Sequence, residues 1–180
     1  KGDIIKTGKP TTRLSDLGYR EVKPSMIPKY ITQHQARVIL GPQDYLFTDE
    51  GVGTFLNHEW NVSSRLDRMG IRLMGPKLDV KPKPEYLMLD AGKDATSIVS
   101  DTIPVGGVQA PGRIPVILGV DGPSTGGYAK IATVISADIT NLGQLRPENK
   151  IRFREVTIHQ AQRALEEYEK KISYDSLLMG

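Results

Sequence analysis

The chain of 180 residues contains no cysteine. Disulfides, thiolate nucleophiles and thiolate metal sites are therefore excluded, and the chain is compatible with the reducing cytoplasm, where we expect it to function. Histidines are few, and none of His34, His58 and His159 has the spacing of a paired-histidine motif, so we expect no metal site. The best apolar run, residues 114–120, is far shorter than the ~20 residues of a membrane helix, so no membrane partner is expected.

The chain also has little excess charge. Twenty-four lysines and arginines stand against 21 aspartates and glutamates, which gives a formal net charge of +3 at pH 7. This bias is too small to indicate binding to a phosphate backbone, so we expect no nucleic-acid partner. The sequence has no Gly-x-Ser-x-Gly motif and no Walker-type phosphate loop, so motif spacing alone names no reaction.

The first part of the chain is polar and rich in proline. Residues 1–36 carry Pro10, Pro24 and Pro28 and show no sustained periodicity, which predicts a linker or the remnant of a preceding half-domain. The chain begins with Lys1, not methionine, and we expect it to be part of something longer. A compact domain is predicted over residues 37–180.

Short apolar runs separated by glycine and proline predict a mainly β fold, a barrel or a sandwich. The expected strands lie at residues 38–40, 60–64, 70–74, 98–99, 105–108, 116–118, 131–135 and 151–156. Thr48 followed by two carboxylates predicts a short helix over residues 49–57, and a capping box at Thr157 predicts a terminal helix over residues 158–172.

Residues 121–130, Asp-Gly-Pro-Ser-Thr-Gly-Gly-Tyr-Ala-Lys, form the densest unusual segment. Its glycines let a ligand approach the main chain, while Ser124, Thr125, Tyr128 and Lys130 supply hydrogen-bond donors. One interpretation is a pocket for an anionic or carbonyl-bearing ligand. The alternative is a turn between two barrel strands, with Tyr128 packed and Lys130 solvated.

Two further segments carry candidate binding residues. Arg68 and Arg72 could clamp a carboxylate or phosphate through their planar guanidinium groups, or share one face of a strand and pair with Asp67 or with glutamates. Gln109 lies between apolar residues and must hydrogen-bond if buried, so it either fixes a loop or binds an amide or carbonyl ligand.

Taken together, these segments resemble the carboxyltransferase-domain family that includes allophanate hydrolase subunit 2, the KipI-antagonist proteins and one of the subunits of bacterial 5-oxoprolinase. The resemblance spans about residues 37–162. It rests on Leu40-Gly41-Pro42-Gln43-Asp44, Asp67-Arg68-Met69-Gly70 with Arg72-Leu73, Gly107-Val108-Gln109-x-Pro111, Thr125-Gly126-Gly127-Tyr128-x-Lys130-Ile131-Ala132-Thr133-Val134, and Leu145-Arg146-Pro147 with Arg152-Phe153.

The resemblance implies a cyclophilin-like β-barrel that works in an ATP-dependent enzyme complex cleaving a small cyclic or urea-derived amide. It implies a homologous partner of the allophanate hydrolase subunit 1 or KipI type, and a missing N-terminal half. By analogy the catalytic residues are Lys130, Tyr128 and Arg68, and the substrate-binding residues are Gln109, Arg72, Asp121, Ser124, Thr125, Gly126 and Gly127.

Two alternatives stay open. One is a non-catalytic regulatory module that binds a KipI-like partner; it is distinguished by whether Lys130 and Tyr128 face a concave pocket or a flat apolar surface. The other is a biotin-dependent carboxyltransferase of the urea carboxylase type, with biotin on a separate carrier. The loop at residues 121–125 leans toward the urea carboxylase version, whereas the Gly-Gly-Glu and His-Pro-Ser segments expected of urea carboxylases are absent.

Overall fold

A computed structural model describes residues 2–18, 21–27, 33–83 and 85–173. The chain divides into two compact units, one comprising residues 30–168 and the other residues 1–29 with 169–180. In the smaller unit, the predicted linker contains two short helical turns, α1 (Leu14–Leu17) and the 3-10 turn η1 (Pro24–Met26).

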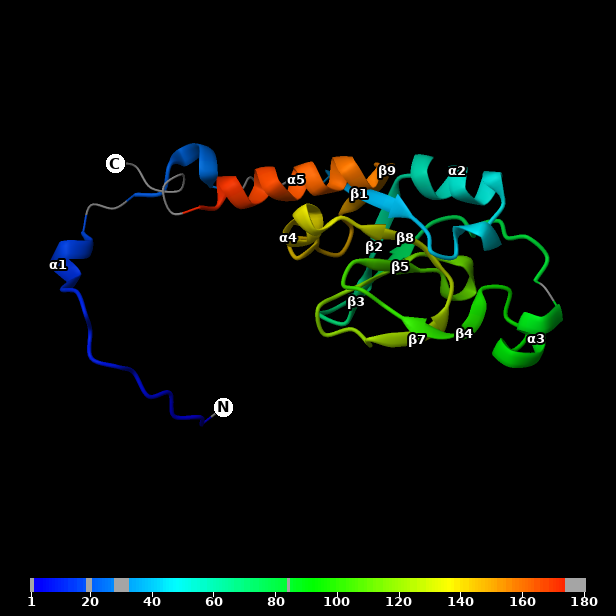
Figure 1. Cartoon of the computed structure of the whole chain (residues 1–180), viewed down its shortest axis with the longest axis horizontal. Helices are drawn as coiled ribbons and strands as arrows, with labels where there is room; N and C mark the ends of the chain where they lie inside the picture. Colours follow the sequence, from blue (N-terminus) through cyan, green and yellow to red (C-terminus); the bar gives the residue numbers. More distant parts are fainter. Residues whose placement is uncertain (1, 19–20, 28–32, 84, 174–180) are drawn as a thin grey trace. The chain divides into compact units, whose positions relative to one another are not determined.

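In the described part of the chain, seven strands form a closed barrel in the order β1-β8-β5-β6-β3-β2-β9 (Figure 1). Their bounds are β1 Gln33–Leu40, β2 Trp60–Leu66, β3 Gly70–Met74, β5 Gly107–Gln109, β6 Val116–Leu118, β8 Lys130–Val134 and β9 Lys150–Glu155. The predicted mainly β barrel is therefore confirmed. The barrel closes where β1 and β9 run parallel, with His34 opposite Ile151.

Two local predictions follow directly from residue pattern. In β9, Ile151 and Phe153 are buried while the alternating charged residues are exposed, as expected of a strand with one face in the core. In α2 (Asp49–Asn57), the Thr48 hydroxyl caps the helix by accepting from the Gly51 amide at 3.0 Å. Both elements form where the sequence predicts them.

The core fills the barrel and extends under α2. Phe55 of α2 stacks on Phe153 of β9 with ring centroids 4.3 Å apart. The indole Nε1 of the fully buried Trp60 donates to the Phe55 carbonyl at 3.0 Å. This bond satisfies the one polar atom that the tryptophan brings into the core.

The remaining helices lie outside the barrel. They are α3 (Glu85–Ala91), α4 (Ile139–Leu142), α5 (Ile158–Lys171) and the 3-10 turns η2 (Asp44–Leu46), η3 (Pro111–Arg113) and η4 (Ser136–Asp138). α5 confirms the terminal helix, with the expected capping box between Thr157 and Gln160. The sequence pattern predicts no helix over α3. None of the helices in the described ranges is long and apolar enough to span a bilayer.

The glycine-rich segment contains a strand. It forms β7 (Thr125–Tyr128), which pairs with β4 (Ser97–Thr102) in a separate two-stranded antiparallel sheet, here called the ribbon. Figure 1 shows the ribbon across the barrel from α2. The interpretation as a turn between two barrel strands is therefore wrong, because these residues form a strand of their own outside the barrel.

An ion pair fixes β1 to the segment before α4. Arg37 donates from Nη2 to Asp138 Oδ1 at 2.6 Å and from Nε to Oδ2 at 3.0 Å, and the Arg37 amide donates to Oδ2 at 2.8 Å. The side-chain hydrogen bonds to Asp138 raise the pKa of Arg37 above its ordinary value. The planar guanidinium is suited to such a two-pronged contact, which lysine could not reproduce.

Two glycines of α2 give opposite predictions. A Cβ at Gly51 would lie 2.0 Å from the Asp79 carbonyl oxygen, whereas one at Gly53 would meet nothing closer than the Asn57 amide nitrogen at 4.0 Å. We expect Gly51→Ala to lower the free energy of unfolding by about 2 to 3 kcal/mol and Gly53→Ala to raise it by up to about 1 kcal/mol. Urea denaturation of both variants measures this, and equal effects would contradict the close contact.

Candidate functional site

Lys130 is the largest charged side chain in the core. It is the first residue of β8, follows β7 after a single alanine, and its side chain is only 1% exposed. Its Nζ donates to Asp101 Oδ2 at 2.8 Å. A buried ammonium needs such a partner, because an unpaired charge in the core is strongly unfavourable. The alternative in which Lys130 is solvated is therefore wrong.

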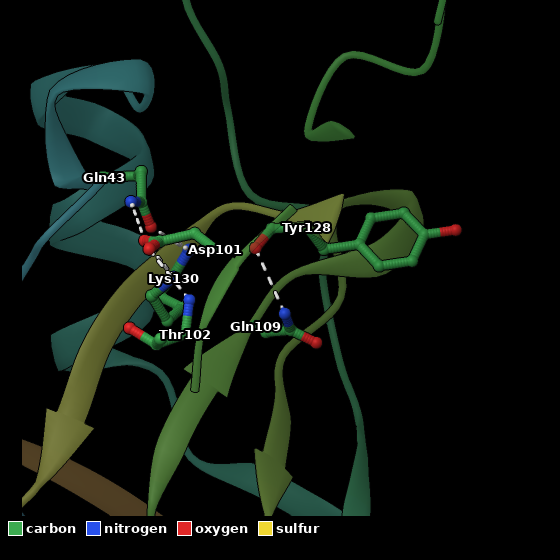
Figure 2. A network of polar contacts seen from close by, with 6 residues as sticks. All are labelled: Gln43, Asp101, Thr102, Gln109, Tyr128 and Lys130. Carbon is green, nitrogen blue, oxygen red and sulfur yellow. Dashed lines mark hydrogen bonds and ion pairs between the residues drawn. The ribbon is translucent and has the colours of Figure 1, made fainter. Parts of the chain in front are cut away.

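Gln43 forms hydrogen bonds with both residues of this ion pair. Its Oε1 accepts from the Lys130 amide at 3.1 Å and its Nε2 donates to Asp101 Oδ2 at 3.0 Å. The backbone amide of Gln43 also donates to the Lys130 carbonyl at 3.0 Å. Figure 2 shows these residues together with Thr102, and we call Gln43, Asp101, Thr102 and Lys130 the Lys130 cluster.

Asp101 connects the Lys130 cluster to solvent. Its side chain is 44% exposed although its partner is buried. Hydrogen bonds from Lys130, from the Thr102 amide and from Gln43 lower the pKa of Asp101 from 3.8 to about 2. The carboxylate is therefore charged at neutral pH and keeps the lysine ammonium neutralised.

Gln109 and Tyr128 lie beside the Lys130 cluster. Gln109 is 6% exposed and its Nε2 donates to the Tyr128 carbonyl at 3.2 Å, so it is buried and hydrogen-bonded as expected. The Tyr128 ring, in contrast, points away from Lys130 (Figure 2), and the residue is 39% exposed. The alternative in which Tyr128 is packed is wrong, because β7 is a partly exposed strand.

The glycines of β7 allow the ribbon to approach Gln109. A Cβ at Gly126 would lie 3.0 Å from Gln109 Nε2 and 2.7 Å from Ile103 Cδ1, and one at Gly127 would lie 3.2 Å from the Ile98 carbonyl oxygen. A Cβ at Gly126 would therefore displace the ends of the Ile103 and Gln109 side chains. Ser124 and Thr125, at the start of the segment, are exposed.

Arg68 lies in the turn between β2 and β3, where it forms an exposed ion pair with Asp121, with Nη2 donating to Oδ1 at 3.0 Å. This pair raises the pKa of Arg68 and lowers that of Asp121. Asp67 instead accepts from the Met69 and Gly70 amides, at 2.8 and 3.1 Å. The expected pairing of Arg68 with Asp67 is therefore wrong, as is a strand face shared with Arg72, because β3 begins only at Gly70.

The register divides the candidate residues into two groups. Gln109 is opposite Lys130 in the β5–β8 pair, while Gly107 is opposite Thr133 toward the other end. At that other end the Gly106 amide donates to the Leu118 carbonyl, and the next residue, Gly119, donates to Met69 in the turn that carries Arg68. Arg68 and Asp121 are therefore associated with the opposite end of these strands from Lys130.

Asp101 and the role of Gln43 were missed by sequence reasoning. Asp101 is 29 positions from Lys130 and lies in a strand with no motif of its own. The only local signal is the polar run Ser100-Asp101-Thr102 directly after two apolar residues. Gln43 lies in a segment that carries the family resemblance, but no pattern in it indicates a contact with Lys130.

The lowered pKa of Asp101 predicts a pH dependence of stability. The carboxylate contributes stability above its ordinary pKa of 3.8, and this contribution is lost as the pH falls from about 3.8 to about 2. We expect the difference in unfolding free energy between the chain and Asp101→Asn to shrink across this window. Urea denaturation at pH 5, 3 and 2 measures it, and a difference that is constant with pH would show that the ion pair does not form.

The structure thus defines a class of protein: a closed β-barrel with a buried lysine and a buried glutamine at one end, covered by a separate ribbon. Residues 1–155 match the family model described as carboxyltransferase domain, subdomain A and B. The chain belongs to this family, which confirms the family inferred from the motifs.

Three proteins illustrate the relationship. A putative urea carboxylase of Emericella nidulans is 31% identical over 153 residues, which cover 82% of this chain and 12% of that protein. A 5-oxoprolinase subunit of Haemophilus influenzae is 39% identical over 105 residues, covering 58% of this chain and 30% of that protein. The crystal structure of the K. lactis urea amidolyase superposes with a TM-score of 0.76 at 27% identity, over 87% of this chain and 10% of that one. The chain thus spans less than a third of each of these proteins.

Proposed function

We propose that this chain supplies the carboxyltransferase-type site of an enzyme complex that processes a small amide, and that the substrate class is urea or a urea-like amide. The observation that carries the proposal is the buried Lys130 ammonium, which pairs with a carboxylate that reaches solvent, on a residue that is the register partner of Gln109 in the β5–β8 pair. Coverage favours this substrate class by a small margin, because the urea carboxylase alignment includes 82% of the chain and the two 5-oxoprolinase alignments 58% and 76%.

Each side chain has a separate part in the proposed chemistry. Lys130 supplies a fixed positive charge that stabilises negative charge developing on a carboxyl or carbonyl oxygen. Gln109 hydrogen-bonds the amide of the substrate, since an amide side chain offers both donors and an acceptor. Tyr128 contributes its backbone carbonyl by orienting Gln109. For Arg68 and Asp121 we propose the separate binding role developed below.

The proposal extends to the surrounding architecture. We take the barrel to be cyclophilin-like, residues 37–180 to be the functional domain, and residues 1–36 to be a linker or the remnant of a preceding half-domain. The complex is proposed to act in the cytoplasm with a homologous partner subunit. The chain has neither a Gly-x-x-x-x-Gly-Lys loop nor a carrier Met-Lys-Met motif. We therefore propose that ATP is bound, and that biotin is covalently attached, on other parts of the complex.

The second candidate is an ATP-dependent amide-cleaving role of the 5-oxoprolinase type. It is favoured by the higher identity, 39%, to the Haemophilus influenzae protein. Both candidate functions use the barrel and Lys130. They differ in the substrate, which is urea in the first and 5-oxoproline in the second.

The test combines the full chain and its partner subunit with a biotinylated carrier and its carboxylase, ATP and ¹⁴C-bicarbonate. We expect ¹⁴C to appear in a small acid-labile product, separated from the carrier by ultrafiltration, only when urea is present, because the carrier itself is carboxylated without urea. Phosphate release that depends on 5-oxoproline, without urea-dependent fixation, would replace this proposal with the second candidate. Absence of both activities alongside tight binding of a KipI-like partner would indicate a regulatory module.

A further inference from the structure

A cavity of about 350 Å³ opens beside Arg68, and neither Lys130, Gln109 nor Tyr128 lines it. Its walls are mainly apolar, formed by Ile117 and Leu118 of the barrel and by Leu142 of α4. Pockets of roughly 300 to 1,000 Å³ with apolar walls and a few polar groups are typical of small-molecule sites. We call this feature the Arg68 cavity.

The polar groups at the Arg68 cavity carry both signs of charge. Arg68 is 74% exposed and uses Nε and Nη2 on Asp121, which leaves three of the five N–H bonds of its guanidinium to donate elsewhere. Asp67 also lines the cavity and accepts two backbone amides through Oδ1. One positive and two negative groups therefore lie close together.

This distribution selects against charged ligands. An anion approaching Arg68 meets the carboxylates of Asp67 and Asp121, while a cation must lose water on entering apolar walls beside a guanidinium. A neutral carbonyl oxygen can accept from Arg68 without either cost. Its apolar body can then bury surface against Ile117, Leu118 and Leu142.

From these observations we propose that the Arg68 cavity is a second ligand site, distinct from the Lys130 cluster, for a neutral molecule with a ring-sized apolar body and a carbonyl or carboxamide acceptor. Arg68 donates to the acceptor and the barrel end receives the apolar body. The site is independent of the chemistry proposed at Lys130, so either assignment can fail without the other.

Three probes of equal size and different charge test the ligand class: benzamide, benzoate and benzamidine. Each is titrated into the ¹⁵N-labelled full chain and followed by amide chemical shifts. We expect benzamide to bind with a Kd on the order of 1 mM, as its nine heavy atoms allow, and to shift the amides of Gly70, Gly119 and Gly143. We expect the two ions to bind at least about threefold more weakly.

Two variants test the location. Gly143 lines the cavity with a helical backbone (φ −64°, ψ −11°), and a Cβ there would have the Thr140 carbonyl oxygen as its nearest neighbour, at 3.5 Å. A Cβ at Gly143 therefore meets no clash, and we expect the longer side chain of Gly143→Leu to weaken benzamide binding at least about tenfold by occupying part of the cavity. Arg68→Met removes the donor and leaves two carboxylates, so benzamide should weaken about threefold while benzamidine strengthens.

Arg154→Met is the matched control for Arg68→Met, because Arg154 is exposed on β9 and does not line the cavity. It should leave all three affinities unchanged. The proposal is overturned if no probe shifts the Gly70, Gly119 and Gly143 amides at 20 mM, if shifts cluster around Gln109 instead, or if either ion binds more tightly than benzamide. If Gly143→Leu does not fold, Arg68→Met still tests the proposal. We expect this variant to bind benzamidine more tightly than the unmodified chain does, and benzamide more weakly.

Discussion

Lys130→Met is expected to lower urea-dependent ¹⁴C fixation by at least about 100-fold, the effect of removing one fixed charged donor from a transition state. Methionine keeps an unbranched apolar side chain out to the ε position and removes the ammonium. Its partner Asp101 is 44% exposed and can be hydrated once the ammonium is gone, so no buried charge is left unpaired. The amide spectrum should therefore show an intact barrel.

Lys150→Met is the control for this prediction. Lys150 is an exposed lysine of β9 that pairs with Glu59 at 2.7 Å, away from the Lys130 cluster. Its replacement should leave fixation within about twofold of the unmodified chain. Lys130 would have no place in the chemistry if its methionine variant fixed ¹⁴C as fast as this control.

Asp101→Ala is expected to have the largest effect on stability among changes in the Lys130 cluster. It leaves the Lys130 ammonium 1% exposed with no carboxylate, and removes the acceptor of the Gln43 side-chain amide. Breaking a pair whose remaining charge is buried is strongly destabilising, so we expect Tm to fall by roughly 5 °C or more. Lys130→Met should change Tm much less, because the charge that it leaves is exposed.

The exposed carboxylate of Asp121 provides the comparison. Asp121→Ala breaks an ion pair in which Arg68 is 74% exposed and Asp121 50% exposed, so both groups keep their water. We expect a Tm change within about 2 °C, because surface ion pairs contribute little. Scanning calorimetry at pH 7 ranks the Tm changes of Asp101→Ala, Lys130→Met and Asp121→Ala. Equal decreases in Tm for Asp101→Ala and Asp121→Ala would refute the burial of Lys130 as the cause of the larger effect.

Local structure was largely predictable from the sequence because it depends on neighbouring residues. The Thr48 cap with two carboxylates in the first turn predicts α2, and apolar alternation predicts β9. The family was predictable as well, since its motifs recur in order along the chain.

The site was less predictable because its contacts are long-range. The Lys130 cluster joins residues from a loop, from the ribbon and from β8, with separations of 29, 58 and 87 positions. No local pattern states that Asp101 will face Lys130, or that Arg68 will pair with Asp121 across 53 positions. The same limit hid the ribbon, because a short glycine-rich strand looks like a turn until its partner is known.

The ribbon lies outside the closed barrel and is hydrogen-bonded as a sheet of only two strands. We therefore expect it to detach at a lower free energy than the barrel unfolds. Asp101 lies on the ribbon, whereas Gln43 stays bonded to the Lys130 backbone. Each detachment therefore exposes an ammonium without its counter-charge, at a frequency that hydrogen exchange of the β4 and β7 amides would measure.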